Sequence, residues 1–510
     1  MRHSLPNLRV YFWICTYLLV LMGFPGCTNQ KQKPQKYQPN IILFMVDDMG
    51  WQDTSVPFGK QKTPFNERYQ TPNMERLAAD GMKFTQAYAT PVCSPTRVSL
   101  MTGMNAAIHR VTNWTLYKDE IKQMEKDHPD LSFPLWNVNG ISPDPNTPHA
   151  VHATTFPMIL RDSGYHTIHM GKAHLGAIGT PGEDPLNLGF EVNIAGHAAG
   201  APKSYYGTEN FGNLPQFTDS PWPVPGLEEY HGEDIFLTEA LTQKALKALD
   251  QNEGSGKPFF LYMAHYAVHT PIMGDPRFVQ KYYDMGIDST EAKYASMVEG
   301  MDKSLGDIMD YLEEKKLDKN TIILFMSDNG GLSAVARGGT PHTHNKPLSS
   351  GKGSAHEGGI RVPMLVKWPG VITPGSVNRN YLIIEDFYPT ILEMAGMRSY
   401  PTVQEIDGVS FVSMMSTPML MVQERPLVWH FPNEWGPTGP GIGAFSAIRQ
   451  GSWKYIFYHL DQREELFNLD TDLGETTNLA DKEPHIKKAL WETLSGFLKA
   501  VDAQMPTRKN

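Results

Sequence analysis

Cys93 lies in the stretch Cys93-Ser94-Pro95-Thr96-Arg97, whose residue types could make the thiol reactive. Ser94 followed by a proline predicts the start of a helix, with Ser94 as its N-cap. Free backbone N–H groups, the positive end of the helix dipole and the guanidinium of Arg97 would then lie near the sulfur. The stretch therefore predicts an anion-binding pocket with a potential nucleophile at its mouth. The alternative is a small buried cysteine, which is the commoner fate of a lone cysteine.

The cysteine count favours chemistry at Cys93. The chain of 510 residues has three cysteines. Cys15 and Cys27 belong to an amino-terminal segment that has the layout of an export signal, so Cys93 is alone in the part expected to fold. An exported protein with one such cysteine cannot use it for an internal disulfide. An unpaired cysteine is then more readily explained by reactivity.

Two acidic pairs follow two similar apolar runs. Asp47-Asp48 comes directly after residues 40–46, and Asp328-Asn329 comes directly after residues 321–327; the runs share Ile-Ile-Leu-Phe-Met. Such runs are typical of central parallel strands, and ligands bind beyond the carboxyl ends of these strands. Three carboxylates and an amide oxygen at one edge suit calcium or magnesium. A single Asp after a strand is usually a turn residue, so the metal site is inferred from the two pairs together.

Two lysines and a histidine are further candidates. Lys172 and His174 follow a predicted strand at 165–170, and Lys352 lies in a loop rich in Gly, Ser and His at 339–359. An isolated surface lysine is nearly always solvated. The flanking glycines and the positions after a strand are what single these residues out.

A second histidine candidate follows the predicted strand 257–264. His269 lies in His269-Thr270-Pro271, and His265 is the competing histidine of the same segment. We favour His269, although a packed loop histidine would also fit. A zinc cluster within the loop 339–359, formed by its three histidines, is the less favoured alternative there. Those histidines are His342, His344 and His356.

Cys93-Ser94-Pro95-Thr96-Arg97, continued by Leu100-Met101-Thr102-Gly103, resembles the maturation signature of the sulfatase family. The resemblance covers nearly the whole mature chain. It implies that a maturation enzyme oxidises Cys93 to formylglycine, an aldehyde whose hydrate is the nucleophile. It also implies one calcium ion. The implied metal site consists of Asp47, Asp48, Asp328, Asn329 and the modified Cys93.

The same resemblance assigns roles to the remaining candidates. Arg97 would stabilise the formylglycine, while Lys172 and Lys352 would hold the sulfonate oxygens. His269 would protonate the departing sugar oxygen. His174 would take a proton from the second hydroxyl, so that the sulfated hydrate collapses to aldehyde and sulfate.

Length and pattern predict an α/β protein with two parts. Residues 39–400 alternate strands and helices and should form the catalytic domain, a large mostly parallel sheet flanked by helices; the resemblance implies the alkaline-phosphatase-like arrangement. Residues 401–510 should form a smaller α+β subdomain with an antiparallel sheet and an amphipathic helix at about 484–501. Hydrophobic residues make up 40% of the chain, enough for a sizeable core.

The amino terminus predicts export. Residues 1–27 have a basic start, a short apolar core and a small residue before Cys27, as in a signal peptide. The end of this segment is similar to a bacterial lipoprotein signal, with Cys27 as the acylated residue; simple cleavage is the alternative. Residues 28–38 are polar and suit a tether. The expected location is the bacterial periplasm. If Cys27 is acylated, its lipid would attach the protein to the membrane.

Substrate specificity should come from other segments. Residues 115–152 and 196–232 look like insertions that form binding loops. In the segment 428–436, we expect His430 and Trp435 to face substrate, and Trp429 and Phe431 to lie in the core. The resemblance to carbohydrate sulfatases makes sulfated galactose or N-acetylgalactosamine the first choice of sugar.

Three functions compete on the sequence. The favoured one is an exo-acting carbohydrate sulfatase, although the sequence by itself does not decide between exo and endo action. The second is a phosphate or phosphonate ester hydrolase on the same scaffold. The third is a catalytically silent sugar-binding lipoprotein, which should have lost a lysine or histidine of the site, whereas none is lost. A net charge of −10 without a basic block argues against nucleic acid as a partner.

Overall fold

The computed structural model describes residues 38–334, 337–417 and 424–509. The predicted signal peptide, most of the tether and Cys27 lie outside the described residues. In the described part, residues from 38 onward form one compact unit. None of the helices in these ranges is both long and apolar enough to cross a membrane.

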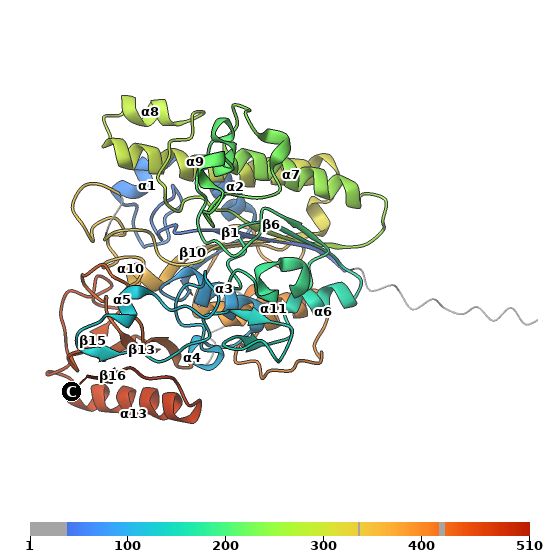
Figure 1. The fold of residues 1–510 in the computed structure, drawn as a ribbon. Helices are drawn as coiled ribbons and strands as arrows, with labels where there is room; N and C mark the ends of the chain where they lie inside the picture. Colours follow the sequence, from blue (N-terminus) through green and yellow to red (C-terminus); the bar gives the residue numbers. More distant parts are fainter. Residues whose placement is uncertain (1–37, 335–336, 418–423, 510) are drawn as a thin grey trace, which may run out of the picture. The chain divides into compact units, whose positions relative to one another are not determined.

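An eight-stranded sheet forms the centre of this unit (Figure 1). Its strand order is β11-β2-β10-β9-β1-β8-β6-β7, and β10 alone among them runs antiparallel to its neighbours. The predicted mostly parallel sheet is therefore confirmed. The strands in chain order are β1 (Asn40–Val46), β2 (Met82–Tyr88), β6 (His166–Gly171), β7 (Val192–Ile194), β8 (Phe259–Ala264), β9 (Thr321–Ser327), β10 (Arg361–Lys367) and β11 (Ser376–Ile383).

The two similar apolar runs lie side by side. β1 pairs with β9 in parallel, from Asn40 opposite Thr321 to Val46 opposite Ser327. Every residue of both strands is buried, because helices cover both faces of the sheet. The register places the two acidic pairs at the same level of one sheet edge. β8 and β6 end at this edge as well.

Strand alternation divides the core into two layers. The odd-numbered residues of β1 pack toward α3, α6 and α11, and the even-numbered ones toward α2, α7 and α9. Figure 1 shows these two groups of helices on opposite faces of the sheet. Their bounds are α2 (Pro72–Asp80), α3 (Cys93–Thr102), α6 (Phe156–Asp162), α7 (Leu237–Asn252), α9 (Ser289–Glu314) and α11 (Phe387–Met394).

The loops that connect the main helices and strands contain further short helices and strands. The short helices are α1 (Pro64–Arg68), α4 (Ala106–His109), α5 (Gln123–Lys126), α8 (Val279–Asp284), α10 (Glu357–Ile360) and α12 (Val412–Ser416). The short strands are β3 (Leu131–Ser132), β4 (Ile141–Ser142), β5 (Val151–His152) and β16 (Thr507–Arg508). β3 pairs with β16, which ties the first predicted insertion to the end of the chain.

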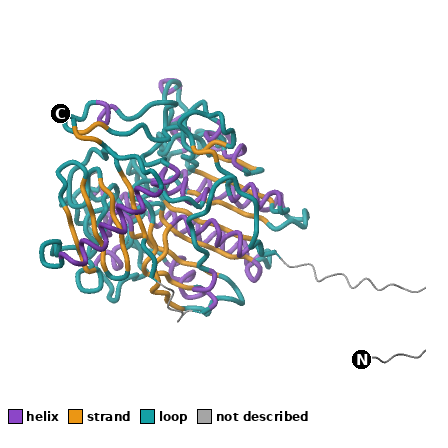
Figure 2. The backbone as a smooth tube through the Cα atoms, turned by 90° about the horizontal axis from the view of Figure 1, so that it is seen from below, coloured by secondary structure: helices purple, strands orange, loops and turns teal. Residues whose placement is uncertain are grey.

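A second sheet comes later in the chain, as predicted. It is antiparallel, in the order β12-β13-β14-β15, and α13 packs across one face (Figure 2). Its other face joins the main core, where Trp429 Nε1 donates to the carbonyl of Ala89. The second sheet therefore belongs to the same compact unit, and the boundary near residue 400 stays a prediction. The bounds are β12 (Leu427–Phe431), β13 (Phe445–Gln450), β14 (Trp453–Tyr458), β15 (Glu464–Asn468) and α13 (Pro484–Ala500).

Candidate active site

Cys93 is the first residue of α3, a helix whose ten residues are all buried. Val92 occupies the N-cap position, so the prediction that Ser94 caps this helix is wrong. Pro95 fits inside the first turn because N–H groups there have no intrahelical partner. The hydroxyl of Ser94 instead accepts from the backbone N–H of Thr115. Cys93 therefore lies inside the first turn of the helix, whereas the cap assignment placed it just ahead of the helix.

The four residues directly after β1 and β9 are fully buried, and each carboxylate has a cationic partner. Lys172 Nζ lies 2.6 Å from Asp47 Oδ2. Lys352 Nζ lies 2.5 Å from Asp48 Oδ1. Arg97 donates from Nε and Nη2 to Asp328 Oδ2, at 3.0 and 2.8 Å. The structure thus brings both predicted lysines and the predicted arginine to the predicted acidic edge.

Three oxygens at this edge are buried and accept no hydrogen bond from any described residue: Asp47 Oδ1, Asp48 Oδ2 and Asn329 Oδ1. Asn329 Nδ2 donates to Asp48 Oδ1 at 2.7 Å, which assigns the amide nitrogen and leaves its oxygen available. Unsatisfied buried oxygens are costly unless something binds them. Two carboxylate oxygens and one amide oxygen form a donor set that suits a hard divalent cation. These residues fit the metal site that the sequence predicted.

The pKa values of the neighbouring carboxyls of Asp47 and Asp48 shift in opposite directions. Burial, together with the carboxylate of Asp328, raises the pKa of Asp47 well above its usual range. Burial acts in the same direction on Asp48, but the ammonium of Lys352 prevails and lowers the pKa of Asp48. Asp48 also adopts a left-handed backbone conformation, with φ of 61°. Strained backbone of this kind concentrates at functional sites.

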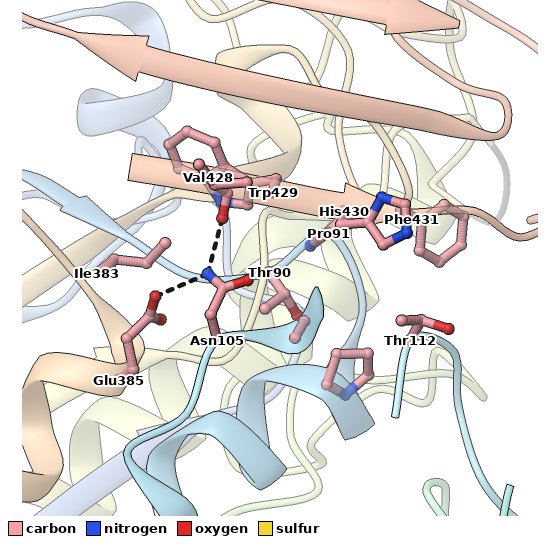
Figure 3. A pocket seen from close by; sticks show the side chains of 12 residues that line it. Thr90, Pro91, Asn105, Thr112, Ile383, Glu385, Val428, Trp429, His430 and Phe431 are labelled. Carbon is pink, nitrogen blue, oxygen red and sulfur yellow. Dashed lines mark hydrogen bonds between the residues drawn. The ribbon is translucent and has the colours of Figure 1, made fainter. Parts of the chain in front are cut away.

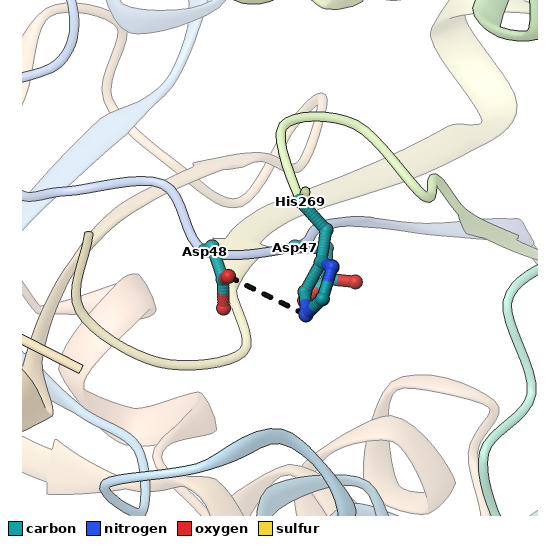
Figure 4. Close-up of side chains that lie close together, drawn as sticks. All are labelled: Asp47, Asp48 and His269. Atoms are coloured by element: carbon teal, nitrogen blue, oxygen red, sulfur yellow. Dashed lines mark ion pairs between the residues drawn. The ribbon is translucent and has the colours of Figure 1, made fainter. Parts of the chain in front are cut away.

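His269 lies against the acidic edge (Figure 4). Its Nε2 is 3.6 Å from Asp48 Oδ2, and Asp47, Asp48 and His269 offer ligand atoms within 4.8 Å of one another. Its Nδ1 is 2.8 Å from the carbonyl of Thr270, which assigns the proton to Nδ1 and the lone pair to Nε2. Burial, and after it the charge of Lys352, lowers the pKa of His269 to about 3. Nε2 is therefore the nitrogen that can exchange a proton in the site.

His174 is held with one nitrogen free for proton transfer. Its Nε2 donates to the carbonyl of Thr115 at 2.9 Å, and its buried Nδ1 has no hydrogen-bond partner among the described residues. Burial, followed by the charge of Lys172, lowers the pKa of His174 well below its usual value. A Cβ on Gly200 would lie 2.3 Å from the imidazole, so the close approach of that loop requires glycine.

A cleft of about 180 Å³ opens above these groups. Four predicted catalytic residues line it, whereas Lys172 and Arg97 lie buried beneath. Gly200, Ala201 and Trp222 come from the second predicted insertion. The full lining is Cys93, Trp114, His174, Gly200, Ala201, Trp222, His269, Lys352 and Trp435. Trp435, predicted to face substrate, therefore lies in the cleft. Charged side chains form the bottom of the cleft, and aromatic side chains form its rim.

Comparison with known protein families decides the identity of this arrangement. The family described as Sulfatase matches residues 39–397, and N-sulphoglucosamine sulphohydrolase, C-terminal, matches residues 351–500. The chain belongs to the sulfatase family. It is a sulfuric ester hydrolase, and its fold is the alkaline-phosphatase-like one that the resemblance implied.

Relatives of this sulfatase extend over most of its length. A protein named Sulfatase from Formosa agariphila is 30% identical over 507 residues, covering 90% of this chain and 87% of that protein. N-acetylgalactosamine-6-sulfatase of Sus scrofa is 32% identical over 460 residues, covering 88% and 77% respectively. The structure of Ps i-CgsB in complex with k-i-k-neocarrahexaose is 25% identical, with a TM-score of 0.71 and coverage of 90% and 93%. Phosphonate monoester hydrolase of Agrobacterium radiobacter shares the fold alone, at 17% identity and a TM-score of 0.60.

His430 does not reach the cleft of the sulfatase, in contrast to the prediction. It is buried on β12, where Nδ1 lies 2.8 Å from Ser446 Oγ and Nε2 donates to the carbonyl of Gln504. Figure 3 shows it beside a separate cavity of about 10 Å³. The segment after α13 covers this face of β12, which local strand alternation could not reveal. Burial lowers the pKa of His430 to about 4, so it is a neutral structural histidine.

The other histidine alternatives are resolved by their contacts. His265 packs against α9, where its Nε2 is 2.9 Å from Ser304 Oγ, and it does not line the cleft. His356 is paired with Glu465 Oε2 at 2.9 Å. Among the described residues, the group of three or more potential metal ligands is Asp47, Asp48 and His269, so a cluster of the loop histidines is not formed.

Trp114, Trp222 and Lys122 could not be identified as individual site residues from the sequence. Trp114 precedes the first predicted insertion, Lys122 lies inside it, and Trp222 lies inside the second. For Trp222 the available signal was an aromatic side chain in a segment already identified as a binding loop, whereas Trp114 lies just outside such a segment and Lys122 is not aromatic. Trp435 approaches the site closely because it packs on Gly353, where a Cβ would lie 2.4 Å from the indole.

Proposed function

We propose that this protein is an exported, exo-acting carbohydrate sulfatase that hydrolyses a sulfate ester in the cleft above residue 93. The observation that supports it best is the convergence of Cys93, His174, His269 and Lys352 on one cleft rimmed by three tryptophans. Charged groups at the base suit a sulfonate, and indole faces suit a sugar ring.

In this proposal Cys93 is oxidised to formylglycine by a maturation enzyme. The aldehyde, once formed, supplies a hydrate whose hydroxyl attacks sulfur. Cys93 is 4% exposed at the base of the cleft, and it is the one cysteine among the described residues. The start of α3 directs backbone N–H groups toward position 93, which favours developing negative charge there.

A calcium ion completes the site in this proposal. Asp47, Asp48, Asp328 and Asn329 would hold it together with residue 93, and the buried unpartnered oxygens of Asp47, Asp48 and Asn329 support this assignment. When bound, the ion supplies positive charge that acidifies a hydroxyl and stabilises the crowded carboxylates. Arg97 fixes the orientation of Asp328 through its two hydrogen bonds.

The remaining side chains bind the ester and move protons. Lys352 reaches the cleft and can hold a sulfonate oxygen, and Lys172 supports the same end from beneath through Asp47. His269 Nε2 carries a lone pair in the free protein, so in this proposal it takes up a proton when the anionic ester binds and then protonates the departing sugar oxygen. His174 Nδ1 would accept a proton from the modified residue 93 when sulfate is released. The hydrogen bonds of the two histidines leave these two nitrogens available.

Galactose or N-acetylgalactosamine sulfate is the proposed substrate class. Relatives that are named N-acetylgalactosamine-6-sulfatase support this choice at about one third identity. A cleft of about 180 Å³, closed in by two loops and Trp435, accommodates little more than one sugar unit, which favours exo action. Export to the bacterial periplasm and acylation of Cys27 belong to the same proposal, and metabolic labelling with a fatty acid tests the acylation.

The decisive experiment couples mass spectrometry of residue 93 with a substrate screen. Protein made with the maturation enzyme should carry the aldehyde at position 93 and release sulfate from a panel of sulfated galactose and N-acetylgalactosamine isomers. Cys93→Ala and Cys93→Ser should be inactive. An active enzyme with only a free thiol at position 93 would overturn the mechanism. Faster turnover of phosphate or phosphonate esters than of sulfate esters would overturn the substrate class.

A further inference from the structure

Lys122 places a second ammonium group beside the cleft. Its Nζ lies 4.5 Å from the centroid of the Trp114 ring and 5.4 Å from that of Trp435. Both tryptophans line the cleft together with Cys93. Contacts between a cation and the faces of two indoles orient the ammonium at the aromatic rim.

The lysine is held from behind by a neutral group. Nζ donates to Asn113 Oδ1 at 2.9 Å. Asn113 is itself fixed, because its Nδ2 donates to Glu125 Oε1 at 2.8 Å and its Oδ1 also accepts from the N–H of Trp114. Within the described residues, no carboxylate oxygen lies within 4.0 Å of the Lys122 ammonium. An ammonium has three donors, and Asn113 engages one of them.

Lys122 has no carboxylate partner among the described residues, unlike Lys352 at the bottom of the cleft. Lys352 Nζ lies 5.7 Å from the centroid of the same Trp435 ring, but it is paired with Asp48. Burial lowers the pKa of Lys122 to about 7, although the more distant carboxylate of Glu125 acts in the opposite direction. A partly desolvated ammonium without a carboxylate in direct contact gains strongly from an incoming anion.

We propose that Lys122, framed by Trp114 and Trp435, binds a second anionic group of the substrate, a sulfate or a carboxylate outside the reacting ester. This inference rests on the proposed function, which places the reacting sulfate at Lys352. It assigns the enzyme to saccharides that carry at least two anionic groups. The second group lies either on the same ring or on the neighbouring sugar. In both cases it is an anion that pairs with the Lys122 ammonium.

The test compares substrates that differ in this second group. Wild type, Lys122→Met, Lys122→Arg and the matched control Lys118→Met, an exposed lysine of the same segment, are assayed on three substrates. These are a monosulfated monosaccharide, a disulfated monosaccharide and a monosulfated disaccharide with a uronic acid. Lys122→Met should lose about 10- to 100-fold in kcat/KM on whichever doubly charged substrate the wild type prefers. It should change less than about 3-fold on the monosulfated sugar, and Lys122→Arg should retain much of the preference.

Equal losses on all three substrates, or no loss on any, would overturn the inference and leave Lys122 structural. A direct binding measurement tests the role of Lys122 independently of the proposed function. Cys93→Ala should bind the preferred doubly charged saccharide more tightly than Cys93→Ala/Lys122→Met by a similar factor. If wild type hydrolyses no sulfate ester, the proposed function fails. The binding comparison still decides the role of Lys122, because equal affinities of the two variants would refute it.

Discussion

The base of the cleft, meaning its bottom, and the rim of the cleft differ in the elements that carry their side chains and in the contacts that hold them. The base consists of side chains at the ends of parallel strands and at the start of α3, and its charged groups are buried in pairs such as Arg97 with Asp328. The rim consists of three tryptophans and Lys122, carried by loops and by the segment after β12. Its contacts are aromatic, and Lys122 has a neutral partner.

This difference separates chemistry from selection. Strand register fixes the side chains at the base of the cleft, and in the proposed function their charges act on any sulfate ester. In the same proposal the rim contacts the sugar, so its residues can select substrates without altering the reaction. Variants of the base should therefore fail on every substrate, whereas variants of the rim should fail selectively.

The largest effect is expected at the base, for Asp328→Ala. Activity should fall by about 10³-fold or more on every sulfate ester. Stability should fall by about 3–5 kcal/mol, because Arg97 would be left buried without its partner. Kinetic assays and chemical denaturation measure the two effects.

The double variant Asp328→Ala/Arg97→Met sharpens this prediction. Removing both charges should restore much of the stability but none of the activity. An Asp328→Ala protein with wild-type stability would show that the ion pair is not a structural part of the base.

Metal removal is expected to have the next largest effect. Exhaustive chelation should abolish turnover of all sulfate esters, and added calcium should restore it. Calcium at 100 times its Kd should stabilise the folded protein by about 2.7 kcal/mol, which raises Tm. Elemental analysis should find one calcium per chain in the wild type and in rim variants alike. Full activity with no bound metal would contradict the proposed site.

A smaller and selective effect is expected at the rim, for Trp222→Ala. KM for the preferred saccharide should rise by up to about 10-fold, since loss of an aromatic surface weakens stacking by about 0.5–1.5 kcal/mol. The value of kcat and the metal content should change little. Trp222→Phe is the matched control and should recover most of the affinity. A fall in kcat on all substrates would instead assign Trp222 to the base.

The smallest effect is expected at Glu385, which lies outside both regions (Figure 3). Glu385 Oε1 accepts from Asn105 Nδ2 at 3.0 Å. Burial raises its pKa from an ordinary 4.5 to about 8, so the folded protein retains a proton that the unfolded chain releases. Its stabilising contribution is complete below pH 4.5 and is lost as the pH rises through 8.

Glu385→Gln should therefore flatten the decline of Tm between pH 5 and about 8, because the amide does not titrate. Activity should stay at the wild-type level on every substrate. Parallel pH profiles of Tm for wild type and variant would contradict the buried, protonated state of Glu385.

Much of the base could be predicted from sequence. The repeated Ile-Ile-Leu-Phe-Met of β1 and β9 indicated two central strands with both acidic pairs beyond their carboxyl ends, and the structure pairs these strands in a register that places the two pairs together. Lys172, His174 and Lys352 were assigned from the family motifs, and they converge as expected. The acidic pairs, Lys172 and His174 could be placed because they follow strand ends, and strand periodicity is a local property of the chain. Lys352 follows no strand end, and its assignment came from its flanking glycines and the family resemblance.

The rim and the surroundings of single histidines were decided by the tertiary structure. His430 alternates correctly along β12, yet the carbonyl of Gln504, 74 residues further along the chain, covers it. His265 and His269 lie four residues apart, but Ser304 of α9 binds the first and Asp48 lies beside the second. Trp114 and Trp222 meet at one cleft, with Lys122 against Trp114, only through the folding of separate loops. Contacts of this kind join distant segments, and no local pattern encodes which segment will cover which face.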